Sequence, residues 1–239
     1  MDTVLHDWPW VGLGLAPLLL TWLFVTTRGR ARATDPAFVL GLLWPMYLVH
    51  QFEEHGVDVL GRRFAFLGDL CVTLGHAEVA TCPAGPAFIF VVNVVACQVA
   101  FAVTEASCAH RPLLALFGWS VPLVNALAHL GAAVKNGFSY NPGLLTAVVL
   151  FVPLGLWAVR TALRAQVVSA RVVPLVVASG VVVHGVLIGS LLLRSAGVVS
   201  DPVVLVMNAL NGAVPAVFFL VASRLVQPAR AAVARHKEA

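Results

Sequence analysis

The sequence predicts an all-α, polytopic integral membrane protein, and three observations carry this prediction. Hydrophobic residues make up 60% of the 239 positions and charged residues only 11%, whereas a soluble domain has about 25% charged residues. The mean hydropathy is +0.92. The apolar residues also fall into segments close to the roughly 20 residues that cross a bilayer as a helix. We therefore expect residues 1–239 to form a single transmembrane domain, folded as a helical bundle.

We expect about seven spans and one long outer loop. Two of the spans begin with a capping signal, Asp35-Pro36 and Asn141-Pro142. In each, the first residue would cap the helix and the proline would take its first position. Pro45 is expected to kink the second span. The spans are residues 8–26, 37–53, 86–105, 113–134, 143–159, 172–193 and 203–222, and the outer loop is 55–85.

The distribution of basic residues predicts the orientation. With the N-terminus outside, the inner segments hold eleven Lys and Arg residues, Arg28, Arg30, Arg32, Arg111, Arg160, Arg164, Arg171, Arg224, Arg230, Arg235 and Lys237. The outer segments hold four, Arg62, Arg63, Lys135 and Arg194. Cytoplasmic loops carry the excess of positive charge, so we expect a protein of the cell's inner (plasma) membrane with a cytoplasmic C-terminus. These short clusters do not indicate nucleic-acid binding, and no basic region precedes the first apolar segment, so we do not expect a cleaved signal peptide.

The stretch His50-Gln51-Phe52-Glu53-Glu54 closes the second expected span. In a helix, Glu53 and Glu54 lie three and four residues after His50 and share its face. Ionisable side chains at the edge of a hydrocarbon layer cost several kcal/mol, about 2.5–3.5 on insertion scales, unless they have a partner. Acids that simply reach water at a helix end are the alternative explanation.

Five further polar residues fall in apolar spans. Counted along a helix from the outer end of each span, they lie at one level, about 8–14 Å below the outer boundary. A lone intramembrane Asn or His usually makes a helix–helix hydrogen bond, but residues at one level indicate a common polar pocket. The five residues are Asn93, His129, His184, Asn208 and Asn211.

The outer loop contains an apolar stretch, residues 64–74, that is expected to form a short helix over the mouth of the bundle. Cys71 and Cys82 both lie in this loop. In an oxidising compartment they would form a disulfide that holds the loop over the His50 region. Cys97 and Cys108 are expected to be buried free thiols.

Three signatures then occur in order: His50-x-x-Glu53-Glu54, Asn125-x-x-x-His129 and Asn141-Pro142-Gly143. The ordered set resembles the HXXEE-motif family of bacterial membrane proteins, from the second to the fifth span. The family is uncharacterised, and its motifs suggest an enzymatic activity. The resemblance points to the motif residues, which here are His50, Glu53, Glu54, Asn125, His129 and Asn141.

Two imidazoles and two carboxylates are a suitable ligand set for iron, manganese or zinc. We expect a site in which His50, His129 and one of Glu53 and Glu54 bind the metal, with His184 as a further candidate ligand. Glu53, Glu54, Asn125 and Asn141 are the candidate catalytic residues, because a carboxylate or an amide can orient ligands or substrate. An apolar bundle with one polar site favours a hydrophobic small-molecule substrate, reached from the lipid bilayer.

Other functions fit the same residues. A glutamate in an apolar pocket donates a proton readily and a histidine accepts one, which suits a metal-free isomerase or cyclase acting on a lipid or isoprenoid. Haem held between His129 and His184 would leave the glutamates without a role. A protein that binds or transports a cation or small ligand is a third class, although no repeated halves are visible in the sequence.

Overall fold

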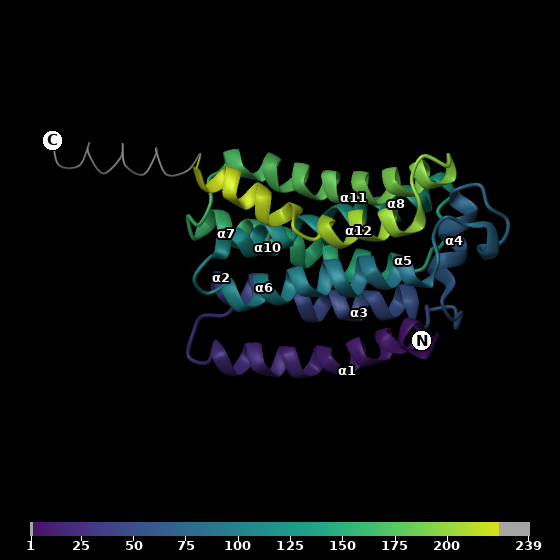
Figure 1. The fold of residues 1–239 in the computed structure, drawn as a ribbon. Coiled ribbons are helices and arrows are strands. Elements are labelled where there is room, and N and C mark those ends of the chain that lie inside the picture. The colour runs from purple at the N-terminus through teal and green to yellow at the C-terminus, as the bar shows by residue number, and fades with distance from the viewer. Residues whose placement is uncertain (1, 225–239) are drawn as a thin grey trace.

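The structure is a computed structural model and describes residues 2–224. The described residues form helices and contain no strand, apart from an isolated bridge between Val57 and Arg63 in the outer loop. Figure 1 shows the long helices running side by side along one direction, with α1 (Asp2–Thr26) at one edge and α11 (Val173–Ser195) at the other. The all-α prediction is confirmed.

Six helical segments within the described range are long and apolar enough to cross a membrane. They match six of the seven expected spans. The first is α1, and the last continues from α12 (Asp201–Asn211) as helix to Arg224. The other four are α5 (Pro86–Phe90), η2 (Val91–Gln98) and α6 (Val99–Ser107); α7 (Pro112–Gly118) and α8 (Ser120–Lys135); α9 (Leu144–Thr146), η3 (Ala147–Phe151) and α10 (Val152–Arg164); and η4 (Ala170–Val172) with α11.

The remaining expected span is divided into two short helices, α2 (Pro36–Gly41) and α3 (Leu43–His55). Proline has no N–H to donate to the carbonyl four residues earlier, and its ring clashes with that carbonyl. For Pro45 that carbonyl belongs to Gly41, where α2 ends. The kink predicted at Pro45 is therefore a break at Leu42. The predicted start of this span is confirmed, since the Asp35 side chain accepts a hydrogen bond from the Ala37 amide, 3.1 Å away.

The predicted start of the fifth span, residue 143, agrees with the structure to within one residue, but the predicted cap is wrong. The helix α9 begins at Leu144, with Gly143 in the left-handed conformation (φ 92°) as the residue before it. Asn141 does not cap this helix, because its side chain bonds to His129 instead. A long-range partner has replaced the local capping bond.

The outer loop contains α4 (Ala65–Thr73) and the short η1 (Val79–Thr81), and Cys71 and Cys82 form a disulfide between these elements. Apolar side chains of α4 pack with Phe88, Leu191 and Val204, near the ends of three long helices. Figure 1 shows α4 at the same end of the bundle as the N-terminus. The expected helix over the mouth of the bundle and the expected disulfide are both confirmed. Cys97 and Cys108 are buried free thiols.

The packing of α8 against α11 is close at Gly180. A Cβ atom built there would lie 2.2 Å from the Ser120 carbonyl oxygen, so only glycine allows this approach. Beside it, the Ser120 and Ser179 hydroxyls are hydrogen bonded over 3.2 Å. This contact fixes α11, which carries His184, against α8, which carries Asn125 and His129.

Candidate functional site

Three side chains at the end of α3 point into the bundle. His50, Glu53 and Glu54 expose only 0%, 5% and 4% of their surface. At this depth an unpaired charge is costly, so each of these side chains needs a partner inside the protein. The partners come from α8 and from residues 140–146, just before and at the start of the next long helical segment.

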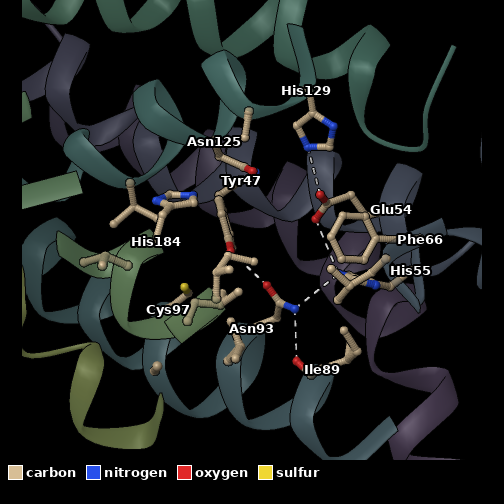
Figure 2. A pocket seen from close by; sticks show the side chains of 18 of the residues that line it. Tyr47, Glu54, His55, Phe66, Ile89, Asn93, Cys97, Asn125, His129 and His184 are labelled. Atoms are coloured by element: carbon tan, nitrogen blue, oxygen red, sulfur yellow. Dashed lines mark hydrogen bonds and ion pairs between the residues drawn. The ribbon is translucent and has the colours of Figure 1, made fainter. Parts of the chain in front are cut away.

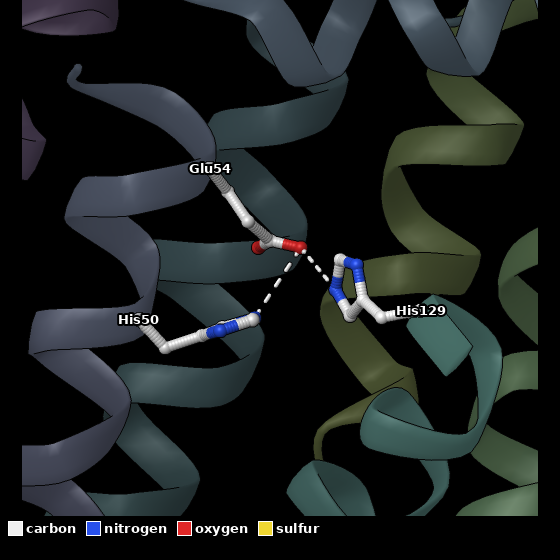
Figure 3. A group of neighbouring side chains, drawn as sticks. All are labelled: His50, Glu54 and His129. Carbon is white, nitrogen blue, oxygen red and sulfur yellow. Dashed lines mark hydrogen bonds and ion pairs between the residues drawn. The ribbon is translucent and has the colours of Figure 1, made fainter. Parts of the chain in front are cut away.

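Glu54 lies between the two histidines. Its Oε1 atom is 3.3 Å from Nε2 of His50 and 3.0 Å from Nε2 of His129 (Figure 3). All three ligand atoms lie within 4.8 Å of one another. His50 and Glu54 are one helical turn apart on α3, whereas His129 comes from α8, so packing of the two helices assembles the group.

Asn141 sets the orientation of the His129 ring. The Asn141 Nδ2 atom donates to the backbone oxygen of His129 (3.1 Å), which leaves its Oδ1 atom facing Nδ1 of the ring, 2.6 Å away. Because Oδ1 can only accept, Nδ1 must carry a hydrogen. In the neutral imidazole, Nε2 then has no hydrogen, and its lone pair is directed at Glu54.

Thr146 sets the orientation of the His50 ring. The Thr146 hydroxyl donates to Oε2 of Glu53 (2.5 Å), so it accepts a hydrogen bond from Nδ1 of His50, 2.8 Å away. The Nε2 atom of His50 therefore also has no hydrogen, and its lone pair accepts a hydrogen bond from Nδ2 of Asn125 (2.9 Å). Each histidine thus has its Nδ1–H fixed by an oxygen acceptor and turns Nε2 toward Glu54.

Three electron-pair donors consequently face one point. Two ligand atoms held tetrahedrally at about 2.1 Å from a metal lie about 3.4 Å apart, and the observed separations from Oε1 of Glu54 are 3.0 and 3.3 Å. Metal-binding histidines commonly donate their other ring N–H to an oxygen, as both do here. The group fits a transition metal, although a proton shared between His129 and Glu54 would also relieve part of the repulsion.

Glu53 points away from this group. Its carboxylate accepts hydrogen bonds from the Tyr140 hydroxyl, the backbone amides of Leu145 and Thr146, and the Thr146 hydroxyl. Partial burial and the bond to Glu53 raise the pKa of Tyr140 above its usual value. Of the two expected glutamates, Glu54 meets both histidines, and Glu53 instead anchors the segment that carries Thr146.

The second oxygen of Glu54 has partners of its own. Gln51 donates to Oε2 over 3.0 Å, and Nε2 of His55 lies 3.4 Å from the same atom. His55 in turn lies 3.2 Å from Nδ2 of Asn93, and Tyr47 donates to Oδ1 of Asn93 over 3.0 Å. A polar chain therefore runs from Glu54 across to η2.

A cavity of about 700 Å³ adjoins this chain. Figure 2 shows Glu54 and His129 at its wall, with His55, Asn93, Asn125 and His184 around it. His50 and Glu53 are not among its lining residues. The prediction of a shared pocket is confirmed, since all five residues expected at one level line this cavity, although most of its lining is apolar: Asn93, His129, His184, Asn208 and Asn211.

His184 does not join the His50–Glu54–His129 group. Within residues 2–224, the cluster of potential metal ligands consists of those three residues, without His184. The Nδ1 atom of His184 bonds instead to the backbone oxygen of Gly180, 2.9 Å away on the same helix. His184 therefore contributes to the cavity wall separately.

Two segments near the polar group, η2 in the cavity wall and η3 beside His50, are π-helical. A π-helical turn is rare and often occurs at a functional site, because the extra residue redirects side chains. Here η2 carries Asn93 and Cys97 toward the cavity, and η3 directly follows Thr146. Both irregular segments adjoin the polar group.

Sequence reasoning missed Thr146, Tyr140 and Gln51. Thr146 and Tyr140 lie within six residues of Asn141, which was the available signal, but their partner Glu53 is more than eighty residues away. Gln51 lies inside the motif, between residues that were noted. Gln51 lies three residues before Glu54, a helical spacing that places the two side chains on one face, and this spacing was the available signal.

The fold and site together define a membrane-type helical bundle with a buried His/Glu group beside an apolar cavity. Residues 41–158 match a family model described as a protein of unknown function with HXXEE motif. This segment is similar to the HXXEE-motif family, and the predicted resemblance is confirmed over it. The motif itself is His50-Gln51-Phe52-Glu53-Glu54. Neither a curated protein nor a solved structure matches the chain.

Proposed function

We propose that the protein is a membrane-embedded enzyme that acts on a lipid-soluble substrate at a metal centre formed by His50, Glu54 and His129. One observation carries the proposal: two Nε2 lone pairs and one carboxylate oxygen face a common point, within 4.8 Å of one another, while each Nδ1–H is held by an oxygen. A metal ion would satisfy all three atoms at once. Without a metal, Asn125 donates to Nε2 of His50, and a proton on Nε2 of His129 would pair that ring with Glu54.

The donor set favours iron, manganese or zinc. Two imidazoles and one carboxylate bind zinc in hydrolytic enzymes and iron in non-haem oxygenases, and both leave coordination positions open. A metal with open positions supplies Lewis acidity or an activated water. His50 would exchange its hydrogen bond from Asn125 for the metal, which frees the Asn125 side chain to orient a ligand.

The cavity supports a substrate of low polarity. Its volume, about 700 Å³, lies within the range of roughly 300–1,000 Å³ that small-molecule sites occupy. Its lining is mainly apolar. Polar side chains lie around Glu54 and on α11 and α12, and a few more lie on α4, on α6 and at the end of α8. A hydrophobic molecule would enter it from the bilayer.

The membrane and the orientation are part of the proposal. Arg111 precedes α7, and Arg164 ends α10, so these two arginines lie at the end of the bundle away from α4. Lys135 and Arg194 end α8 and α11 at the α4 end. This supports a plasma-membrane protein with the α4 end outside. Arg230, Arg235 and Lys237 of the predicted cytoplasmic C-terminus lie outside the described residues.

Elemental analysis tests the metal centre. The full-length protein, purified in detergent, is compared by plasma mass spectrometry with its His129→Ala and Glu54→Gln variants. We expect near-stoichiometric iron, manganese or zinc in the wild type and its loss in both variants. His110→Ala is the matched control, because His110 is exposed and far from the group in sequence, and it should keep the metal. Wild-type protein without metal, even after incubation with each ion, would refute the centre.

The second candidate is metal-free proton transfer. The observation that favours it is that Glu54 and His129, 3.0 Å apart, both line the cavity, whereas His50 does not. His129 would then hold the proton at Nε2 and Glu54 would be its base partner, suiting isomerisation or cyclisation of a lipid. Metal-free proton transfer predicts that the protein stays active after a chelator has removed all metal. The metal-centre proposal predicts that this activity is lost.

A further inference from the structure

The cavity wall contains acceptor groups that no described residue satisfies. Asn208 and Asn211 line it from α12 and expose only 1% and 6% of their surface. The Nδ2 atom of Asn208 donates to Ser190 and to the Val204 carbonyl, and that of Asn211 donates to the Val183 carbonyl. These acceptors fix both amides. Within the described residues both Oδ1 atoms have no donor and are themselves fully buried, so they lie behind the cavity surface and are not open to a ligand. Buried acceptors without a partner are rare in native proteins.

His184 and Asn125 also offer hydrogen-bond acceptors without a donor. His184 donates from Nδ1 to the Gly180 carbonyl, so its Nε2 atom is an acceptor, and no described residue bonds to it. Asn125 donates from Nδ2 to His50, which leaves its Oδ1 atom as an acceptor. In Figure 2, His184 and His129 stand on either side of Asn125.

Asn93 shows that these free acceptors are not a general property of the lining. Its Oδ1 atom accepts from Tyr47, and its Nδ2 atom is bonded to Ile89 and faces His55. Asn93 is thus satisfied inside the protein. The unpaired acceptors are confined to one side of the cavity, on α8, α11 and α12.

The charges around the cavity exclude an anionic ligand. Its charged lining residues are Glu54, Asp69 and Lys135, and the last two are exposed at the outer end. No Arg or Lys lines the buried part, so a carboxylate or phosphate would meet only acceptors. An ammonium group is also a poor fit, because the free acceptors are a neutral amide and an imidazole, and Glu54 already faces His50, His129, His55 and Gln51.

We propose that the cavity binds a lipid alcohol, an uncharged hydrophobic molecule whose single hydroxyl hydrogen is donated to a free acceptor on the cavity wall, Nε2 of His184 or Oδ1 of Asn125. The lining residues on α8 run from Lys135 to Val121, about 21 Å of helix at 1.5 Å per residue. This length suits a long chain with the hydroxyl at one of these acceptors. The proposal rests on the proposed function only in taking this cavity as the substrate site.

Competition binding tests the donor requirement. Radiolabelled hexadecanol is bound to the full-length protein in nanodiscs, with empty discs to correct for partition, and is displaced by unlabelled hexadecanol, methyl hexadecyl ether, hexadecanoic acid or hexadecylamine. The ether has the same chain but cannot donate. We expect hexadecanol to compete best and the ether about fivefold to tenfold more weakly, as for one lost hydrogen bond. No saturable binding of hexadecanol, equal competition by the ether, or stronger competition by the acid or the amine would overturn the proposal.

Variants locate the hydroxyl. His184→Leu removes an acceptor from the cavity and should erase much of the difference between alcohol and ether, whereas His184→Gln offers an acceptor oxygen and should restore it. Asn125→Leu removes the other acceptor. Persistence of the full alcohol preference in both His184→Leu and Asn125→Leu would contradict the assignment. Metal content is measured on the same samples: protein that prefers the alcohol but holds no metal refutes the metal centre alone, and protein that holds metal without this preference refutes the lipid alcohol alone.

Discussion

His129 and Asn141 are joined by two hydrogen bonds in opposite directions. The ring Nδ1 of His129 donates to Oδ1 of Asn141 over 2.6 Å, and Nδ2 of Asn141 donates to the backbone oxygen of His129 over 3.1 Å. The second bond defines which end of the amide faces the ring. The first therefore defines which ring nitrogen is left for Glu54.

Asn141→Ala is predicted to weaken metal binding about 10- to 100-fold, the usual effect of removing a group that orients a metal-binding histidine. Without Asn141, the His129 ring can rotate and Nδ1–H loses its acceptor. The measurement is a chelator titration of the metal-loaded protein. Asn136→Ala, in the exposed turn after α8, is the control, and unchanged affinity in Asn141→Ala would refute the orienting role.

Thr146→Val is predicted to destabilise the protein by about 1–3 kcal/mol, because it leaves Nδ1–H of His50 buried without an acceptor. Valine has nearly the same shape, so packing is kept while both side-chain bonds of Thr146, to His50 and to Glu53, are lost. The measurement is the thermal midpoint in detergent. Thr146→Ser keeps the hydroxyl and should stay near the wild type; equal midpoints for the valine and serine variants would contradict the interpretation.

The site could be predicted from the sequence where helical spacing determines contact. His50 and Glu54 are four residues apart on α3, and Asn125 and His129 are four apart on α8, so each pair shares a face. The spacing cannot show which glutamate meets His129, because that depends on how α3 packs against α8. Glu53 was an equal candidate until Thr146 and Tyr140 were seen to hold it.

The fold was also predictable where local sequence determines structure. The prediction failed where a distant contact overrides a local rule. Apolar length defines six of the spans, and Asp35 caps α2 as its type predicts. Asn141 has an equally good capping sequence, but its side chain binds His129. Pro45 gave a signal for distortion, and only the structure shows that the helix is interrupted at Leu42, between α2 and α3.

Tyr140 is predicted to ionise above its usual pKa of about 10. Burial and the bond to Glu53 favour the protonated phenol. The chain has two tyrosines, so in the Tyr47→Phe variant Tyr140 is the one tyrosine whose absorbance is titrated. We expect its titration midpoint to fall toward 10 when Glu53→Gln is added. Because the folded pKa is raised, the bond is intact below pH 10 and is lost as pH rises through the higher value; identical midpoints in the two proteins would refute the contact.

Gly143→Ala is predicted to abolish metal binding while the protein still folds. A Cβ atom at Gly143 would lie 2.6 Å from Cε1 of His129 and 2.8 Å from Cγ of Glu54, so it would push both side chains apart. The backbone also has φ +92° there, which costs a non-glycine residue about 1–2 kcal/mol.

Gly137→Ala separates the two effects, because Gly137 has φ +70° with open space around its Cβ position. Both variants should lose similar backbone stability, measured as the thermal midpoint of metal-free protein, apart from about 1–3 kcal/mol of additional overpacking at Gly143. Only Gly143→Ala should lose the metal, since only its Cβ reaches the group; retention of metal in Gly143→Ala, or its loss in both, would show that this contact does not control the site.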